Sequence, residues 1–150
     1  MQMSLRMFTL YATLGLANLG AVADVCQEMT TLVSQARTNF DSGDMTALTG
    51  ATSCALSQSL AGNAAYTCAW QFSFRDQAAT TAFDAFNTHV GTCFAQSNAV
   101  IADAGVNHPD TYFQRLYTVD GATIRISLKD KSALQQTYVF VGIQRGDAAR

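Results

Sequence analysis

Cysteines are the residues whose type and spacing indicate chemistry most clearly in this chain. There are four of them, Cys26, Cys54, Cys68 and Cys93, and the gaps between them are too long for the closely spaced ligand pairs of a zinc site. We therefore predict no metal site and no cofactor. An even number of cysteines behind an export signal, described below, is typical of disulfides, so two disulfides are expected.

Histidine and carboxylate side chains offer acid–base chemistry at one place. His108 stands two residues before Asp110, in a stretch with the composition of a loop, where functional groups concentrate. Neither a Gly-x-Ser-x-Gly elbow nor a Cys-x-x-Cys pair occurs in the chain. No residue is therefore assigned as catalytic, and His108 and Asp110 are kept as candidate binding residues.

Basic side chains supply further candidate binding residues. Arg115 lies in an expected strand whose register places it on the helix-facing side, as a half-buried charge that needs a partner, unless a bulge turns it outward. Lys129 and Lys131 flank Asp130 in an expected solvated turn. Nine Lys+Arg against eleven Asp+Glu, without a basic cluster, make nucleic acid an unexpected partner.

The first 23 residues have the pattern of a secretory signal peptide. Arg6 precedes an apolar run, and Ala21-Val22-Ala23 supplies the small-residue site, so we expect cleavage between Ala23 and Asp24. Cys26 does not directly follow the small residues, which argues against a lipid anchor. The expected product is one exported domain, residues 24–150, in a bacterial periplasm or exterior, with no integral membrane anchor.

Two helices and five strands are predicted from the spacing of apolar residues. The first helix begins with Asp24 as its N-cap and ends near Phe40, and the second begins with Asp76 as its N-cap and ends near Phe94. The strands are expected at residues 52–60, 64–74, 112–119, 122–128 and 137–143. Asp120-Gly121 predicts a type I′ turn, and residues 95–110 are expected to form a packed loop.

This order, α-β-β-α-β-β-β, predicts an α+β fold. We expect a two-layer sandwich in which two antiparallel helices pack on one face of a mostly antiparallel sheet of about five strands. Antiparallel helices bring Cys26, at the start of one, near Cys93, at the end of the other. Cys54 and Cys68 are equally distant from the hairpin tip and can lie opposite each other. The expected disulfides are therefore Cys26–Cys93 and Cys54–Cys68.

With no catalytic or cofactor motif, the sequence favours a non-catalytic binding protein. We expect an inhibitor, accessory factor or chaperone-like partner of another envelope or secreted protein, with Tyr112, Tyr117 and Tyr138 as contact anchors. One alternative is a small envelope enzyme that uses His108 and Asp110. A second is a carrier that holds a small apolar ligand between helices and sheet. Nothing in the sequence sets an oligomeric state.

Overall fold

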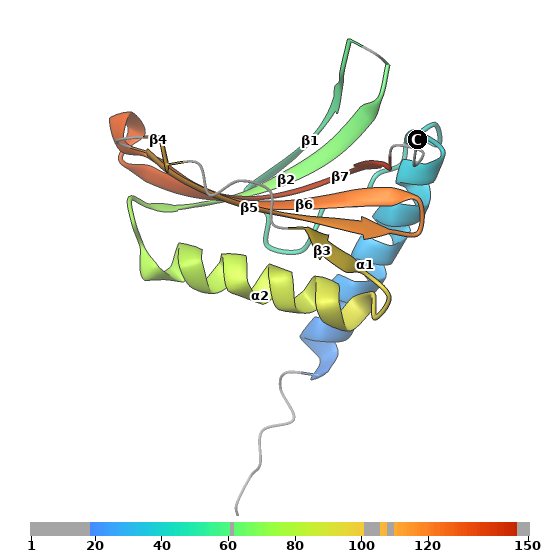
Figure 1. The fold of residues 1–150 in the computed structure, drawn as a ribbon, viewed down its shortest axis with the longest axis horizontal. Coiled ribbons are helices and arrows are strands. Elements are labelled where there is room, and N and C mark those ends of the chain that lie inside the picture. Colours follow the sequence, from blue (N-terminus) through green and yellow to red (C-terminus); the bar gives the residue numbers. More distant parts are fainter. Residues whose placement is uncertain (1–18, 61, 101–105, 108–109, 147–150) are drawn as a thin grey trace, which may run out of the picture.

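A computed structural model describes residues 19–60, 62–100, 106–107 and 110–146. Its two α-helices and seven strands follow the predicted order, with two short strands added between the second helix and the final three strands (Figure 1). The elements are α1 (Leu19–Arg37), β1 (Ser53–Gln58), β2 (Ala64–Ser73), α2 (Gln77–Cys93), β3 (Asn98–Val100), β4 (Val106–Asn107), β5 (Asp110–Val119), β6 (Ala122–Lys131), the 3-10 turn η1 (Ser132–Leu134) and β7 (Gln136–Arg145).

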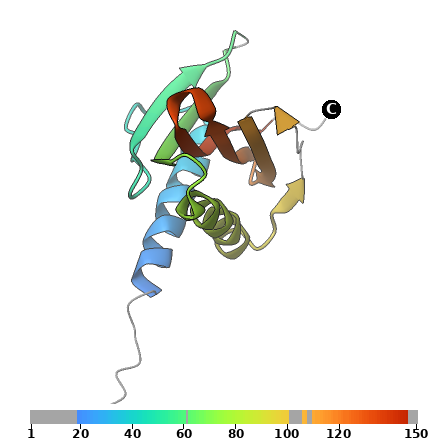
Figure 2. The same ribbon diagram turned by 90° about the vertical axis from the view of Figure 1, so that its left-hand side faces the viewer.

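The sheet is antiparallel throughout, and its strand order is β1-β2-β7-β6-β5-β3, with β4 paired to β5. The last strand, β7, therefore inserts between β2 and β6 at the centre. Both helices lie against one face of this sheet, which confirms the predicted two-layer α+β fold (Figure 2). Every second residue of the central strands points to the helices, and these side chains are buried: Tyr66, Cys68, Trp70, Ile124, Ile126, Leu128, Val139, Val141 and Ile143.

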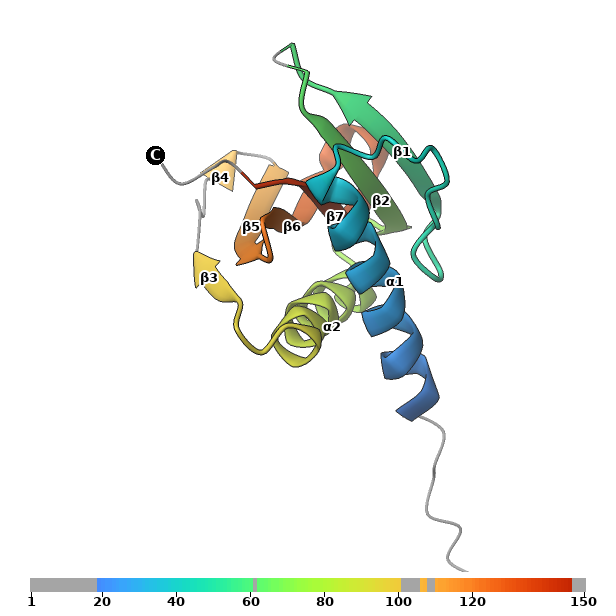
Figure 3. The same cartoon turned by 90° about the vertical axis from the view of Figure 1, so that its right-hand side faces the viewer.

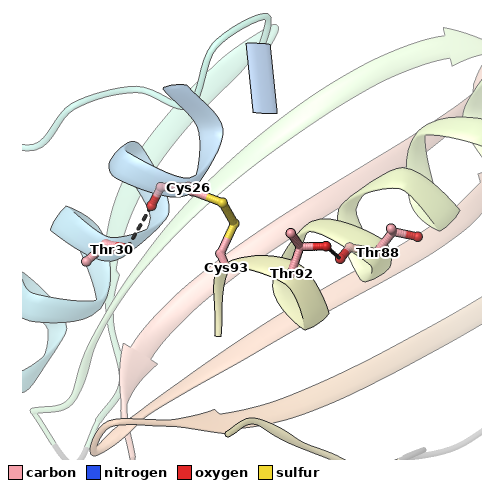
Figure 4. Close-up of a disulfide and its surroundings, with 5 residues drawn as sticks. All are labelled: Cys26, Thr30, Thr88, Thr92 and Cys93. Atoms are coloured by element: carbon pink, nitrogen blue, oxygen red, sulfur yellow. Dashed lines mark hydrogen bonds between the residues drawn. A yellow bond between two sulfur atoms is a disulfide. The ribbon is translucent and has the colours of Figure 1, made fainter. Parts of the chain in front are cut away.

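The end of α2 meets α1 part-way along its length. Their axes cross steeply in Figures 1 and 3, where the prediction had placed them antiparallel, and the first turns of α1 project beyond the end of α2. Both helices contact the same three strands, β2, β6 and β7, so their crossing is set by how each helix packs on this twisted surface. The contact predicted from antiparallel helices nevertheless forms, because Cys26, inside α1, lies beside Cys93 at the end of α2 (Figure 4).

The structure pairs the cysteines as the element order predicts. Cys26 is bonded to Cys93 across the two helices, and Cys54 is bonded to Cys68 across β1 and β2, where the two residues stand opposite each other in the register. The first disulfide joins residues 67 positions apart and the second joins residues 14 positions apart. No cysteine of the chain is free.

The two predicted helix caps had different outcomes. Asp76 caps α2 as predicted, since its side chain accepts a hydrogen bond from the Ala78 backbone N–H at 2.9 Å. Asp24 is not an N-cap, because α1 already begins at Leu19 and Asp24 lies inside it. The preceding small and apolar residues continue the helix without a break, so the capping signal at Asp24 is overridden.

The turn at Asp120 and Gly121 was predicted correctly. Both residues have positive φ, 45° and 77°, as a type I′ turn requires. The resulting register pairs Arg115 with Ile126 and Leu116 with Arg125. The predicted register of the hairpin is therefore confirmed, although Phe113 and Arg115, on its helix-facing side, are exposed.

The predicted turn at Lys129, Asp130 and Lys131 is wrong, because all three residues belong to β6. Asp130 is buried on the helix side, where its carboxylate accepts hydrogen bonds from Thr137 Oγ1 at 2.6 Å and Arg75 Nε at 3.1 Å. These partners stabilise a charge inside the strand, so the chain turns only afterwards, at η1. The predicted loop 95–110 also differs, since it contributes the short strands β3 and β4.

A buried hydrogen-bond chain attaches α2 to the sheet. The Tyr117 hydroxyl of β5 donates to Asn87 Oδ1 at 2.6 Å, and Asn87 Nδ2 donates to the Phe83 carbonyl at 2.7 Å. Asn87 and Tyr117 are both buried. Tyr117, predicted as a contact anchor, is therefore part of the core.

We predict that Asn87→Ala lowers the free energy of unfolding by about 1–3 kcal/mol, because it leaves the buried Tyr117 hydroxyl without an acceptor. Equilibrium urea unfolding measures this loss. In a Tyr117→Phe background the same substitution should have a smaller effect. An equal effect in both backgrounds would show that the hydrogen bond contributes nothing.

Each disulfide should stabilise the fold mainly by restricting the unfolded chain. On the chain-entropy relation, replacing Cys26 and Cys93 by Ala lowers the free energy of unfolding by about 4 kcal/mol, and replacing Cys54 and Cys68 lowers it by about 3 kcal/mol. Guanidinium unfolding of the two double variants gives both values. A larger loss for the hairpin pair would contradict this ranking.

Candidate functional site

The sheet face opposite the helices, here called the outer face, carries the described features best suited to binding. Neither α1 nor α2 covers it in Figures 1 and 2. It is formed by the alternate residues of the central strands whose neighbours are buried in the core. Its members with larger side chains are Gln71, Tyr112, Gln114, Leu116, Arg125, Lys129, Lys131, Gln136, Tyr138, Phe140 and Gln144.

The charged side chains described on the outer face are all positive. Arg125, Lys129 and Lys131 lie at alternate positions of β6, between core residues that point the other way. Among the described side chains none of the three forms an ion pair; the described ion pair joins Arg75 to Asp130 on the helix side. The whole chain has a net charge of −2, so the rest of the chain carries a net negative charge, opposite in sign to that of the outer face.

Aromatic rings accompany these cations. Tyr138 and Phe140 stack on neighbouring outer positions of β7, with ring centroids 5.6 Å apart and planes at 14°. Lys129 Nζ lies 5.8 Å from the centroid of the Tyr112 ring, which is cation–π distance. The two tyrosine hydroxyls donate to the side chains of Gln114 and Gln136 on their own strands. The rings are thereby held in position on the surface.

A shallow hollow of about 220 Å³ opens in the middle of the outer face. Gly142 lies in its floor, paired with Thr67 on one side and Arg125 on the other. A Cβ atom at position 142 would stand 3.2 Å from Thr67 Oγ1, so the glycine leaves open the space between Thr67 and Arg125. Phe140 and Tyr112 border the same hollow. It therefore combines a guanidinium, a hydroxyl and aromatic surface.

The structure separates the basic residues that the sequence singled out. Lys129 and Lys131 lie on the outer face, although they belong to a strand and not to the expected turn. Arg115 lies on the helix side, as its register predicts, but it is exposed and not half-buried. Its guanidinium stands 5.9 Å from the centroid of the Phe83 ring. Because it remains in water, Arg115 needs no carboxylate partner.

The two acid–base candidates fall largely beyond what can be described. His108 lies outside the described residues. Asp110 begins β5, where its backbone pairs with Asn107, and its side chain is not among those described. Their role as binding residues or as an enzyme's acid and base stays a prediction.

Other titratable groups bring no further chemistry together. Within the described ranges, no three His, Cys, Asp or Glu side chains gather as metal ligands. His89 packs edge-on against Phe86, with ring centroids 6.3 Å apart. Burial raises the pKa of the Tyr66 phenol above its ordinary value, which keeps this core residue neutral.

Sequence reasoning missed the residues at the centre of the site. Gly142 and Phe140 were placed in a strand but were not recognised as outer-face residues. The available signal was the strand 137–143 itself, in which Tyr138 and Phe140 alternate with Val139 and Val141. Bulky residues on both sides of a strand indicate that each side contacts something.

Comparison with known proteins adds no function. The chain matches no protein-family model, and a search among curated proteins finds no relative. Among the described residues, no helix has the length and apolar character needed to cross a membrane.

Proposed function

We propose that this chain is an exported, non-catalytic binding protein that takes an acidic segment of another envelope or secreted protein on the outer face of its sheet. The observation that carries the proposal is the combination of Arg125, Lys129 and Lys131 with half-buried aromatic rings and no described carboxylate on the same face. Tyrosine, phenylalanine and arginine are enriched in protein interfaces, where aromatic rings supply contact area and arginine pairs with carboxylates.

The shape of the site favours a protein segment over an enclosed small molecule. The hollow of about 220 Å³ is smaller than typical ligand pockets of roughly 300–1,000 Å³. It lies within a broad face built from four long strands. An extended segment can cross this face, with one carboxylate at Arg125, a second at Lys129 and an apolar side chain at Phe140.

The carrier alternative has less support from the packing between the layers. Met29, Leu32, Ile124 and Ile126 have no exposed surface, and they fill the described space where helices and sheet meet. An apolar ligand would have to displace closely packed side chains. The outer face offers binding surface without such rearrangement.

Export is part of the proposal, and the two disulfides support it. Structural disulfides persist in oxidising compartments and are rare in the cytosol. Cleavage between Ala23 and Asp24 would fall inside α1 and leave Cys26 as the third residue of the product. The Cys26–Cys93 bond would then hold the shortened helix against α2.

We predict that protein recovered from the envelope or medium of expressing cells begins at Asp24. Intact-mass and N-terminal peptide mass spectrometry would show this end directly. Recovery of protein that still begins at Met1, or that has lost residues beyond Cys26, would contradict the proposed processing.

Reversal of the outer-face charges should abolish recognition of an acidic partner. The test variant combines Arg125→Glu with Lys129→Glu, and we expect partner binding to fall by roughly tenfold or more, because like charges then face each other. Mild crosslinking of the tagged, oxidised protein in its own envelope fraction, followed by quantitative mass spectrometry, identifies the partner and measures its recovery.

A control variant with the same net charge combines Arg37→Glu with Arg115→Glu, which lie outside the outer face. This variant should retain the partner. For both the native protein and this control, partner recovery should fall as ionic strength rises, because salt screens the charges. Equal recovery by the native protein and by the outer-face variant would refute the proposed site.

A further inference from the structure

The sheet has one long edge strand, β1, that no described part of the chain covers. β1 ends the strand order, whereas the opposite edge, β5, is partly covered by the short strands β3 and β4. In Figure 1 the β1–β2 hairpin rises away from the helices, and five of the six residues of β1 are exposed. β1 therefore presents a strand edge to its surroundings.

The hydrogen bonds at both ends of the hairpin show which backbone groups point outward. Ser59 N–H donates to the Asn63 carbonyl at 2.9 Å, and Gln71 N–H donates to Thr52 Oγ1 at 3.1 Å, so the odd-numbered residues of the two strands face each other. The Cα atoms of Cys54 and Cys68 are 4.0 Å apart, as in a non-hydrogen-bonded pair. The backbone N–H and C=O groups of Cys54, Leu56 and Gln58 consequently point away from β2.

This edge lacks the usual features that keep strand edges apart. Residues 53–58 contain neither a charged residue nor proline, and both are common protections of free edges. Leu56, in the middle of the strand, is 41% exposed. The Cys54–Cys68 bond fixes β1 to β2, so the edge is already ordered and loses little conformational entropy on pairing.

We propose that β1 pairs with β1 of a second copy of this chain, antiparallel about a two-fold axis at Leu56. In this register Leu56 lies opposite Leu56 of the other copy, and Cys54 lies opposite Gln58, so every outward N–H of one strand meets an outward C=O of the other. The second copy is favoured because the strand is self-complementary in this register and carries no charge that would meet itself.

The pairing would join two sheets into one and place both outer faces on the same side. A two-fold axis perpendicular to the sheet relates the copies, since the strands of one continuous sheet keep their face orientation. The inference goes beyond the proposed function, because it uses the edge of β1 and none of the outer-face cations.

The test uses the oxidised chain of residues 24–150, with two variants that place opposite charges at position 56. Sedimentation equilibrium should show a reversible dimer of the native chain. Leu56→Lys and Leu56→Glu should each raise its dissociation constant by roughly tenfold or more, because like charges then lie directly opposite. An equimolar mixture of the two variants should recover dimer, since position 56 then pairs Lys with Glu.

Leu134→Lys is the matched control, because Leu134 is also exposed, at 59%, but lies on η1 away from β1. It should leave the dissociation constant unchanged, as should the outer-face charge reversal. Near-ultraviolet circular dichroism checks that each variant is folded. A native chain that stays monomeric to about 1 mM, which corresponds to about 4 kcal/mol of association free energy, would overturn the proposal.

Amide hydrogen exchange provides a second measurement that depends on the register. As concentration rises, the amides of Cys54, Leu56 and Gln58 should become protected, whereas those of Ala55 and Ser57, already bonded to β2, should change little. A dimer that protects none of the three outward amides, or that fails to re-form when the Leu56 variants are mixed, would place the contact elsewhere and overturn the inference.

Discussion

Two helices can cover only one face of a long sheet, and the rest of this structure depends on that constraint. The strands bury alternate residues against α1 and α2, so the core is complete on one side. The other face and the β1 edge must then be compatible with water or be covered by something else. A basic and aromatic outer face and an uncharged edge are the two surfaces that result, and both are suited to contacts with other chains.

The disulfides hold the parts that this packing supports least. α1 and α2 cross steeply, and Cys93 at the end of α2 is bonded to Cys26 inside α1. β1 lies beyond the helices and packs on β2. The disulfide between Cys54 of β1 and Cys68 of β2 holds the two strands together. Covalent links at these positions keep α1, α2 and β1 ordered without a larger core, which fits the proposal that the domain is exported.

Local signals predicted the elements well, and long-range packing explains what they missed. Three correct predictions depend only on local sequence, within one turn, one helix start or one hairpin. They are the Asp120-Gly121 turn, the Asp76 cap and the pairing of Cys54 with Cys68. The polar residues around Asp130 predicted a turn. In the structure its hydrogen bonds to the distant residues Arg75 and Thr137 make it a buried strand residue. The crossing of the helices depends on sheet twist, which no local pattern reports.

The same distinction applies to the site. Lys129 and Lys131 were selected as binding residues from their charge, but their shared face with Arg125, Tyr138 and Phe140 depends on strand pairing. Nuclear magnetic resonance titration of the labelled protein with poly-L-glutamate, against poly-L-lysine as control, tests the central claim most directly. Shifts confined to the outer residues of β6 and β7, and caused only by the acidic polymer, are the predicted result. Shifts centred on the helices, or equal responses to both polymers, would contradict it.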